Sequence, residues 1–313
     1  NLVISGYDVN GYQFYCEVTE DLSCSVASNA AQVKTDSKTW NGSAWSPLGT
    51  PGLGTAVTIN GNYNTVSHGS FSACSLVVNA TFTLTIEDNT YVEVENNTAV
   101  YGTILVQTKG AFVQNNDNGT FTLYGSGTAS VNKLTAPINA WYEYTYWSSP
   151  VENETIGDAL VDSPASRRFW FDASNWLDAT YETNNDNTSV AGIGVDNVDD
   201  DGNDWQRADA TDIMIPGVGY AATYSPSLFT ADGQTYTYNF EGPFNTRTVT
   251  VPVVKNGVDG DVDWNFIGNP YPSAVDSDLF IAANLYDAST NPLGALEGAL
   301  YFWSQNTPPS STI

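Results

Sequence analysis

Short apolar strands that recur at a fixed spacing constrain this chain more than any single residue does. Three such runs reappear 28 or 29 positions later: Leu76–Val78 as Ile104–Val106, Leu84–Ile86 as Phe112–Gln114, and Val92–Val94 as Phe121–Leu123. Turns rich in Asn, Asp, Gly and Thr separate them. A period of roughly 20–50 residues is typical of stacked repeats, in which each copy buries its apolar edge against the next. The spacing therefore predicts a β-solenoid.

The residue types around these runs favour strands over helices throughout the chain. Thr, Asn, Gly, Val and Tyr are abundant, whereas Lys, Arg, Met and Glu, which surface helices use, are scarce. Alternation is strict where it is clearest: Val92 and Val94 point to one side, Glu93 and Glu95 to the other. Because only two clear copies of the repeat exist, we expect a short stem of two to three turns.

The strand pattern of the sequence changes near residues 39 and 135, and these two changes divide the chain into three parts. Residues 1–38 show weak alternation and are predicted to be an N-terminal cap or the end of a preceding module. Residues 39–134 are assigned to the short parallel β-solenoid. Residues 135–313 carry longer, aromatic strands without a long helical pattern, which predicts an antiparallel, jelly-roll-like β-sandwich truncated at its C-terminus. The overall fold class is all-β.

Two local features are predicted inside the third part. Tyr236–Phe240 and Thr246–Val254 lie on either side of Gly242-Pro243, which indicates a hairpin-like pair. Asp276-Ser277 can cap a short helix that runs over Leu279–Asn284.

The charge of the chain excludes several classes of partner. Nine basic residues against 35 acidic ones give a formal net charge of −26. Phosphate backbones and anionic membrane surfaces repel such a chain, so we expect no nucleic-acid binding. No stretch of the sequence approaches a membrane span, so we expect no membrane insertion. Two interpretations of the acidity stay open: solubility in a salty medium outside the cell, or carboxylates gathered to hold cations.

Cysteine and histidine give no catalytic signal. Cys16 and Cys24 are close enough in sequence to form a disulfide in an oxidising compartment, and whether they do stays open. Cys74 precedes an apolar run and is predicted to be a small buried residue. His68 is the only histidine and lies in a Ser-His-Gly-Ser segment without a neighbouring carboxylate, so a turn residue is favoured over a general base.

An acidic loop between residues 196 and 204 is the best candidate for a metal site. Oxygen-bearing side chains alternate there around Gly202, as in a calcium loop, where alternate side chains converge on one hard cation. The candidate ligands are Asn197, Asp199, Asp201, Asn203 and Asp209. The twelfth position is Ala208 instead of a bidentate Glu, so the loop is not a full EF-hand. The alternative is a solvated acidic loop; a second cluster, Asp259–Asp263, is better explained as a hairpin turn.

Aromatic clusters in the third part allow a sugar-binding interpretation. Residues 141–147 and 169–176 contain Trp, Tyr and Phe at several positions, and exposed rings can stack on sugar rings. One face of an alternating strand belongs in the core, however, where Trp and Tyr bury large areas. A core role is therefore favoured.

Several segments together resemble modules of large Bacteroidota surface proteins that the type IX secretion system exports. These segments are residues 39–45, 71–79, 144–151, 267–274 and 299–303, that is TWNGSAW, FSACSLVVN, YTYWSSPV, IGNPYPSA and ALYFW. The resemblance covers most of residues 39–313 and includes adhesins and gliding or attachment filaments. It implies an extracellular, cell-surface location and a C-terminal sorting domain that lies outside this chain. It brings no catalytic residues with it.

These observations lead to one expected function and one alternative. We expect a non-enzymatic structural or adhesive module of a large secreted surface protein or filament, with other copies or modules of the same protein as partners. The alternative is a carbohydrate-binding or carbohydrate-degrading module, with glycans as partners and calcium as a candidate cofactor.

Overall fold

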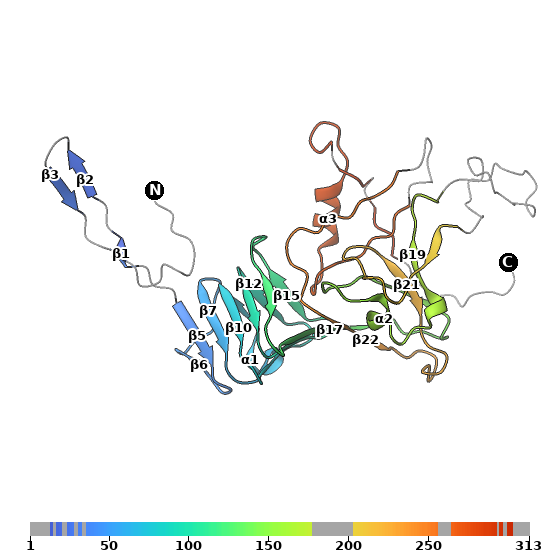
Figure 1. Ribbon diagram of the computed structural model, residues 1–313, viewed down its shortest axis with the longest axis horizontal. Helices are drawn as coiled ribbons and strands as arrows, with labels where there is room; N and C mark the ends of the chain where they lie inside the picture. Colours follow the sequence, from blue (N-terminus) through green and yellow to red (C-terminus); the bar gives the residue numbers. More distant parts are fainter. Residues whose placement is uncertain are drawn as a thin grey trace, which may run out of the picture.

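The computed structural model describes residues 36–176, 203–255, 264–292, 294–296 and 299–302, and the strand bounds within residues 13–32 (Figure 1). Those early strands form two antiparallel pairs. The pairs are β1 (Gln13–Phe14) with β4 (Ala31–Gln32), and β2 (Glu17–Glu20) with β3 (Cys24–Ala27).

Residues 36–134 form a β-solenoid of about four turns, built from three sheets in which the strands of successive turns pair in parallel. Sheet 1 contains, in spatial order, β6 (Trp45–Ser46), β5 (Asp36–Trp40), β7 (Thr55–Ile59), β10 (Ser75–Val78), β13 (Thr98–Val100) and β16 (Phe121–Leu123). Sheet 2 contains β8 (Tyr63–Asn64), β11 (Thr83–Ile86), β14 (Thr103–Val106), β17 (Thr128–Leu134) and, from the second half, β22 (Thr237–Glu241). Sheet 3 contains β9 (Phe71–Ala73), β12 (Tyr91–Val94) and β15 (Ala111–Gln114).

The predicted solenoid is confirmed, but its predicted period and length are wrong. Leu76 pairs with Thr98, 22 positions on, and Ile86 pairs with Val106, 20 positions on. The 28-residue offset instead matches β10 of sheet 1 with β14 of sheet 2. The strands on the three faces of a turn share a similar alternation of buried and outward residues. A strand therefore resembles the strand on the next face of the following turn as well as it resembles its own pairing partner. The expected two to three turns are about four, since the strands Thr55–Ile59 and Thr128–Leu134 each belong to a further turn.

Alternation along the strands builds the solenoid core. In β11, Leu84 and Ile86 are buried while Thr83 and Thr85 are not, and the same pattern holds in β12 for Val92 and Val94. Parallel register then stacks buried residues of successive turns into columns, such as Leu84, Ile104 and Ala129. These columns remove apolar surface from water on every turn.

An aromatic cluster closes the N-terminal end of the solenoid core. Trp40 and Trp45 face each other across the β5–β6 hairpin with ring centroids 5.4 Å apart, and Trp40 lies 4.9 Å from Tyr63. Tyr63 in turn contacts Phe71 at 5.2 Å. His68, at the end of α1 (Thr65–His68), places its ring 4.5 Å from that of Trp40. The hairpin thus covers an end that a repeat would leave open.

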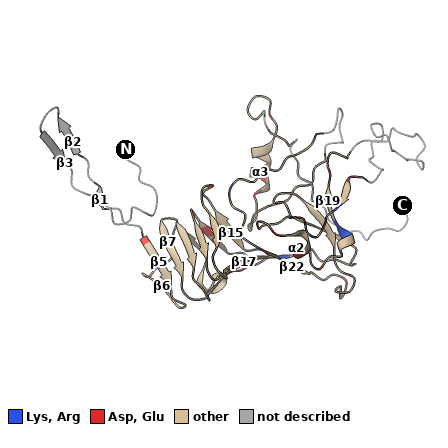
Figure 2. Ribbon diagram, in the orientation of Figure 1, with Lys and Arg blue, Asp and Glu red and all other residues tan. Residues whose placement is uncertain are grey.

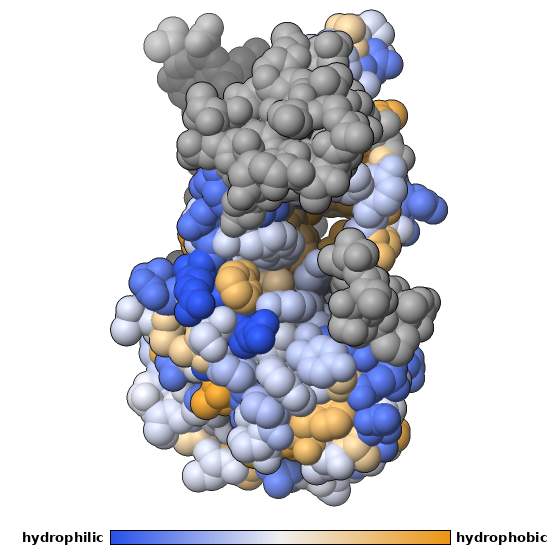
Figure 3. Space-filling view, turned by 90° about the vertical axis from the view of Figure 1, so that its right-hand side faces the viewer, coloured by the Kyte–Doolittle hydropathy of each residue, from blue (hydrophilic) through white to orange (hydrophobic). Residues whose placement is uncertain are grey.

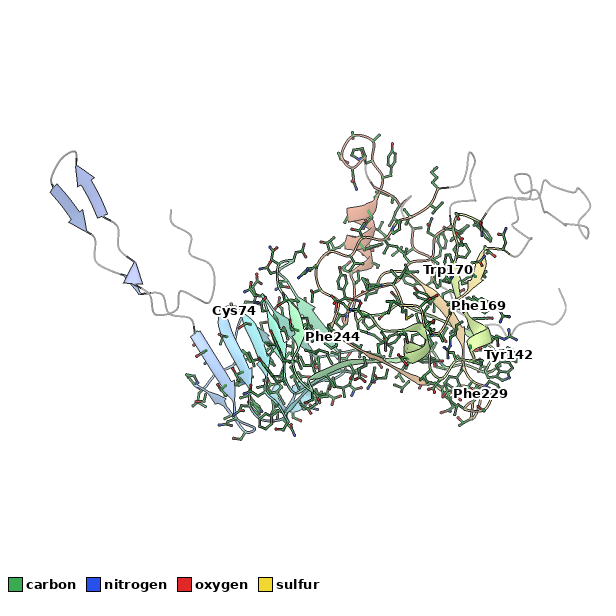
Figure 4. All side chains as sticks on the ribbon, in the orientation of Figure 1. Cys74, Tyr142, Phe169, Trp170, Phe229 and Phe244 are labelled. Carbon is green, nitrogen blue, oxygen red and sulfur yellow. The ribbon has the colours of Figure 1, made fainter. Side chains whose placement is uncertain are left out.

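The second half supplies the cap at the other end. Strand β22 adds antiparallel to β17, so that Asn132 lies opposite Asn239. The ring of Phe244 packs against Phe112 and Phe121 of the last turns, and the label in Figure 4 shows it at this junction. The backbone N–H of Phe112, on the edge of sheet 3, donates to the carbonyl of Pro272 at 2.9 Å. One continuous hydrophobic core therefore runs through both halves.

The second half has one sheet of its own among the described residues. This four-stranded antiparallel sheet 4 has the order β18 (Tyr144–Trp147), β21 (Tyr220–Thr223), β19 (Arg168–Phe171) and β20 (Trp205–Arg207). Its inner face meets β22 through Trp147, whose ring lies 4.4 Å from that of Tyr238. Short helices α2 (Ile156–Ala159) and η2 (Ala165–Arg167) lie in the connections.

Of the two local features predicted here, one is confirmed and one is wrong. Helix α3 (Ser277–Asn284) begins where predicted, and the Asp276 carboxylate accepts from the N–H groups of Asp278 and Leu279 at 3.0 Å. The hairpin is wrong, because the partner of β22 is β17 and residues 246–254 form no strand. Strand β17, with seven residues, is longer than its neighbours in the solenoid, and β22 pairs with its free edge.

Candidate functional site

The outer face of sheet 2 is a polar surface that both halves build. Residues that alternate with the buried ones point outward, and register lines them up in rows across the strands. One row contains Asn64, Thr85, Leu105, Ser130 and Glu241; the next contains Glu87, Gln107, Asn132 and Asn239. We call this surface the polar face.

Hydrogen bonds connect neighbours on the polar face. The amide of Asn64 donates to Glu87 Oε1 at 2.7 Å, and that of Asn132 donates to Gln107 Oε1 at 3.1 Å. The Asn239 amide donates to Asn132 Oδ1 at 2.9 Å, which carries the ladder into the second half. The backbone N–H of Glu87 donates to Thr65 Oγ1 at 2.9 Å. These contacts hold the side chains in one orientation.

A hollow of about 300 Å³ lies at the end of the polar face. Its lining is Val66, Glu87, Asp88, Gln107, Thr108, Asn132, Leu134 and Thr237. Val66 and Leu134 are 66% and 42% exposed and bring apolar surface to a polar lining. The Asp88 carboxylate accepts from the backbone N–H of Lys109 at 2.7 Å, which fixes the adjoining corner. The hollow thus combines hydrogen-bonding side chains with two apolar ones.

A second hollow, of about 290 Å³, lies where the two halves meet beside β15. Asn245 is buried there, and its amide donates to the carbonyls of Ser149 and Pro270 at 2.9 and 2.8 Å. The hydroxyl of Tyr271 donates to the carbonyl of Arg247 at 2.6 Å. The side chains of Asn245 and Tyr271 thus hold segments together, while Gln114, which also lines this hollow, has a buried Oε1 without a hydrogen-bond partner among the described residues.

Most of the predicted calcium loop lies outside the described residues, which include Asn203 and Asp209 but not Asn197, Asp199 or Asp201. Asn203 and Asp209 are both exposed, and the Asn203 carbonyl accepts from the Asn175 amide at 3.1 Å. The second acidic cluster, residues 259–263, also lies outside the described residues. Within the described part of the chain, no group of three or more His, Cys, Asp or Glu side chains is placed to hold a metal ion. Figure 2 shows the described acidic residues spread over both halves.

The aromatic residues of sheet 4 divide between its two faces. Trp147, on the inner face, is 7% exposed, as a core residue should be. On the outer face Tyr146 and Trp205 are each 36% exposed, and both pack against Phe266, with centroids 4.6 and 5.7 Å away. Figure 4 labels Phe169 and Trp170 on the same sheet. The planes of Tyr146 and Trp205 differ by 32°, so these rings form an edge-packed cluster and not a flat stacking platform.

The surface of this end of the molecule is mixed. In Figure 3 the described residues show hydrophobic side chains in small patches between hydrophilic and neutral ones. No helix among the described residues is long and apolar enough to cross a membrane.

Cys74 lies in a place that differs from the expected one, whereas His68 lies in a single helical turn. His68 ends a helical turn and packs on Trp40 and Tyr63, so its ring belongs to the N-terminal cap. Cys74, labelled in Figure 4, is half-buried and not fully buried as predicted, because it lies at the corner between β9 and β10. Its Sγ accepts from the Asn96 amide at 3.4 Å. Cys16 and Cys24 have no described side chains.

A buried carboxyl group lies at the junction of the halves. Glu154 is 6% exposed; its Oε1 accepts from the N–H of Glu241 at 2.9 Å, while its buried Oε2 has no hydrogen-bond partner. Burial raises the pKa of Glu154 to about 7, and the charges of Asp158 and Glu241 act in the same direction, against the bond from the Glu241 N–H. Glu154 lines neither of the two hollows described above.

The sequence did not single out the residues of the polar face. Glu87, Gln107 and Asn132 each directly follow a buried residue of sheet 2, namely Ile86, Val106 and Val131. A polar residue at the same place in each turn was the available signal. It became readable only with the true period, since these residues are 20 and 25 positions apart.

The comparisons with known proteins yield a single family. Its model, described as "Domain of unknown function (DUF8693)", matches residues 33–313. No curated protein and no solved structure matches the chain. The family match takes in the whole solenoid and the second half alike, and on that ground the chain belongs to the DUF8693 family.

Proposed function

We propose that this chain is a non-catalytic structural or adhesive module at the outside of the cell, within a larger secreted surface protein. The resemblance to type IX-exported surface proteins supports the location. The net charge of −26 suits a salty extracellular medium. The partners would be further modules or copies of the same surface protein.

One observation carries this proposal: sheet 2 continues from the solenoid into the second half through the β17–β22 pair. Five residue pairs join these strands, from Ser130 with Glu241 to Leu134 with Thr237. Phe240 and Phe244 are fully buried beneath them. A hinge between halves needs an interface that opens easily, whereas a shared sheet and core resist bending. Such a rigid unit suits a spacer that holds a binding surface away from the cell.

Two experiments test the proposal. Antibodies against the chain should label intact cells of the source organism, and deletion of the coding segment should lower attachment of cells to surfaces. Labelling only after lysis would overturn the extracellular location. Screening on polysaccharides should show no turnover by the purified chain, and clear turnover would replace the structural role by an enzymatic one.

We also propose that residues 135–313 form an antiparallel, jelly-roll-like sandwich that borrows a strand from the solenoid. Sheet 4 packs on the inner side of β22, where Trp147 lies 4.4 Å from Tyr238 and 6.0 Å from Phe240. Tyr224, next to β21, lies 6.2 Å from Tyr238. Two sheets with interleaved aromatic rings between them are the basis of a sandwich core. An experimental structure of the full chain tests this arrangement.

A carbohydrate-binding role is the second candidate, and the polar face favours it. The face presents amides, hydroxyls and carboxylates in register over five strands and contains the hollow at its edge. Glycans are recognised by such donors and acceptors together with apolar contacts. Glycan-array binding of the purified chain tests this role, and absence of any bound glycan would count against it.

A further inference from the structure

We propose that the hollow beside Glu87 and Gln107 binds a neutral glycan, through a sugar hydroxyl that bridges these two side chains. The inference rests on the carbohydrate-binding role and names its site and ligand class.

The starting observation is a break in the hydrogen-bond ladder of the polar face. Asn64 bonds to Glu87, and Gln107 bonds to Asn132, but Glu87 and Gln107 do not bond to each other although they lie on adjacent strands. Among the described residues, Glu87 Oε2 and Gln107 Nε2 have no hydrogen-bond partner. An acceptor and a donor are thus left side by side, and both residues line the hollow.

A hydroxyl group fits this break chemically. It donates one hydrogen bond and accepts others, so it can donate to Glu87 and accept from Gln107. Neighbouring strands lie about 4.8 Å apart, and two hydrogen bonds of about 2.8 Å that meet at one oxygen span a similar distance. An ion of either sign would satisfy only one of the two side chains.

The rest of the lining selects for a neutral sugar. Leu134 and Val66 border the hollow with exposed apolar surface, against which the C–H groups of a sugar ring can pack. Thr108 and Thr237 add hydroxyls. The lining contains two carboxylates, Glu87 and Asp88, against one nearby cation, Lys133, which interacts with the charge of Asp88, so the balance of charge disfavours acidic sugars.

Isothermal titration calorimetry with cellohexaose, mannohexaose and hexagalacturonic acid tests the proposal. At least one neutral hexasaccharide should bind, and the acidic one should not. Gln107→Met, which removes the donor and keeps the length of the side chain, should weaken binding at least about tenfold. Glu87→Gln removes the charge from the hydrogen bond and should weaken binding by a smaller factor.

Matched control variants show whether a loss of sugar binding is specific to the hollow. Gln234→Met changes an exposed glutamine of the second half, and Glu93→Gln changes a carboxylate of sheet 3 that already bonds to Ser72 and Asn115. Both should bind as the wild type does, and circular dichroism should show all four variants folded. Neutral sugar binding that survives Gln107→Met and Glu87→Gln overturns this site while leaving the carbohydrate-binding role intact. Absence of binding to both neutral hexasaccharides, or tighter binding of the acidic one, overturns the ligand class.

Discussion

The ring of Phe244 stacks on that of Phe121, with 4.6 Å between the ring centroids and 29° between the planes. Phe121 belongs to the last turn of the solenoid and Phe244 to the second half, 123 positions later in the sequence. Phe112, on the preceding strand β15, contacts the ring of Phe244 at 5.3 Å. This contact makes the solenoid and the second half depend on each other for stability.

Replacing Phe244 should therefore destabilise both halves together. Phe244→Ala removes a fully buried ring and is expected to cost about 3–5 kcal/mol of unfolding free energy. Urea denaturation followed by circular dichroism should give a lower midpoint in a single transition. Phe302→Ala, at a site that is 83% exposed, serves as control and should leave the midpoint nearly unchanged. Two separate transitions in the wild type would contradict the shared core.

Glu154 should make stability depend on pH. Its pKa is raised from 4.5 to about 7 in the folded chain, so the unfolded chain releases this proton first. The folded form binds more protons between these values, and stability falls as pH rises from about 4.5 to 7. Glu154→Gln does not undergo this loss. The unfolding free energy of the variant relative to that of the wild type should therefore rise between pH 5 and pH 8, by on the order of 2 kcal/mol.

Thermal melts of the wild type and Glu154→Gln from pH 5 to 8 measure this difference. Glu152→Gln, two positions away and exposed, is the control and should differ from the wild type by the same amount at every pH. A constant gap between Glu154→Gln and the wild type would show that the buried carboxyl does not titrate in this range.

Gly102 should tolerate no side chain, since it lies at a corner of the solenoid against the carbonyls of Phe82 and Asn79. A methyl group there must displace backbone, and Gly102→Ala is expected to cost about 1–3 kcal/mol. Gly54 has open space around it and no positive φ, so Gly54→Ala should be neutral or slightly stabilising. Denaturant titration of both variants compares them, and equal stabilities would argue against the tight corner.

Calcium should stabilise the chain if the loop of Asn197, Asp199 and Asp201 binds it with Asn203 and Asp209. An ion that binds only the folded form raises the melting temperature of the protein by mass action. Thermal melts with EDTA should give a lower midpoint than melts with EDTA already saturated with calcium. Asp199→Asn combined with Asp201→Asn should remove the difference. An unchanged wild-type midpoint with EDTA rules the site out.

How far the sequence predicts this molecule depends on whether the relevant interactions are local. Alternation of Val92 with Glu93 predicted a strand, and Asp276 predicted a helix start, because both effects act within a few residues. The period was misassigned because the three faces of a turn share one pattern. The partner of β22 was missed because a free edge of β17, more than 100 residues away in the sequence, determines it.

The same reasoning explains why the sequence did not predict the polar face. Glu87 and Gln107 are ordinary polar residues in sequence, and only the parallel register of β11 and β14 makes them neighbours. The calcium loop, by contrast, was a local pattern and easy to notice. Local patterns reveal candidate ligands that are close in sequence, whereas sites on stacked strands require the register first.

The continuity of sheet 2 also sets an order of events during synthesis. The turns of the solenoid form from residues close in sequence and can fold as they leave the ribosome, whereas β17 pairs with residues 237–241. Until those residues emerge, the edge of β17 and the rings of Phe112 and Phe121 stay uncovered. An exposed strand edge beside apolar surface invites pairing with another nascent chain. A folding helper that shields the half-made chain should thus matter most in the interval between residues 134 and 244.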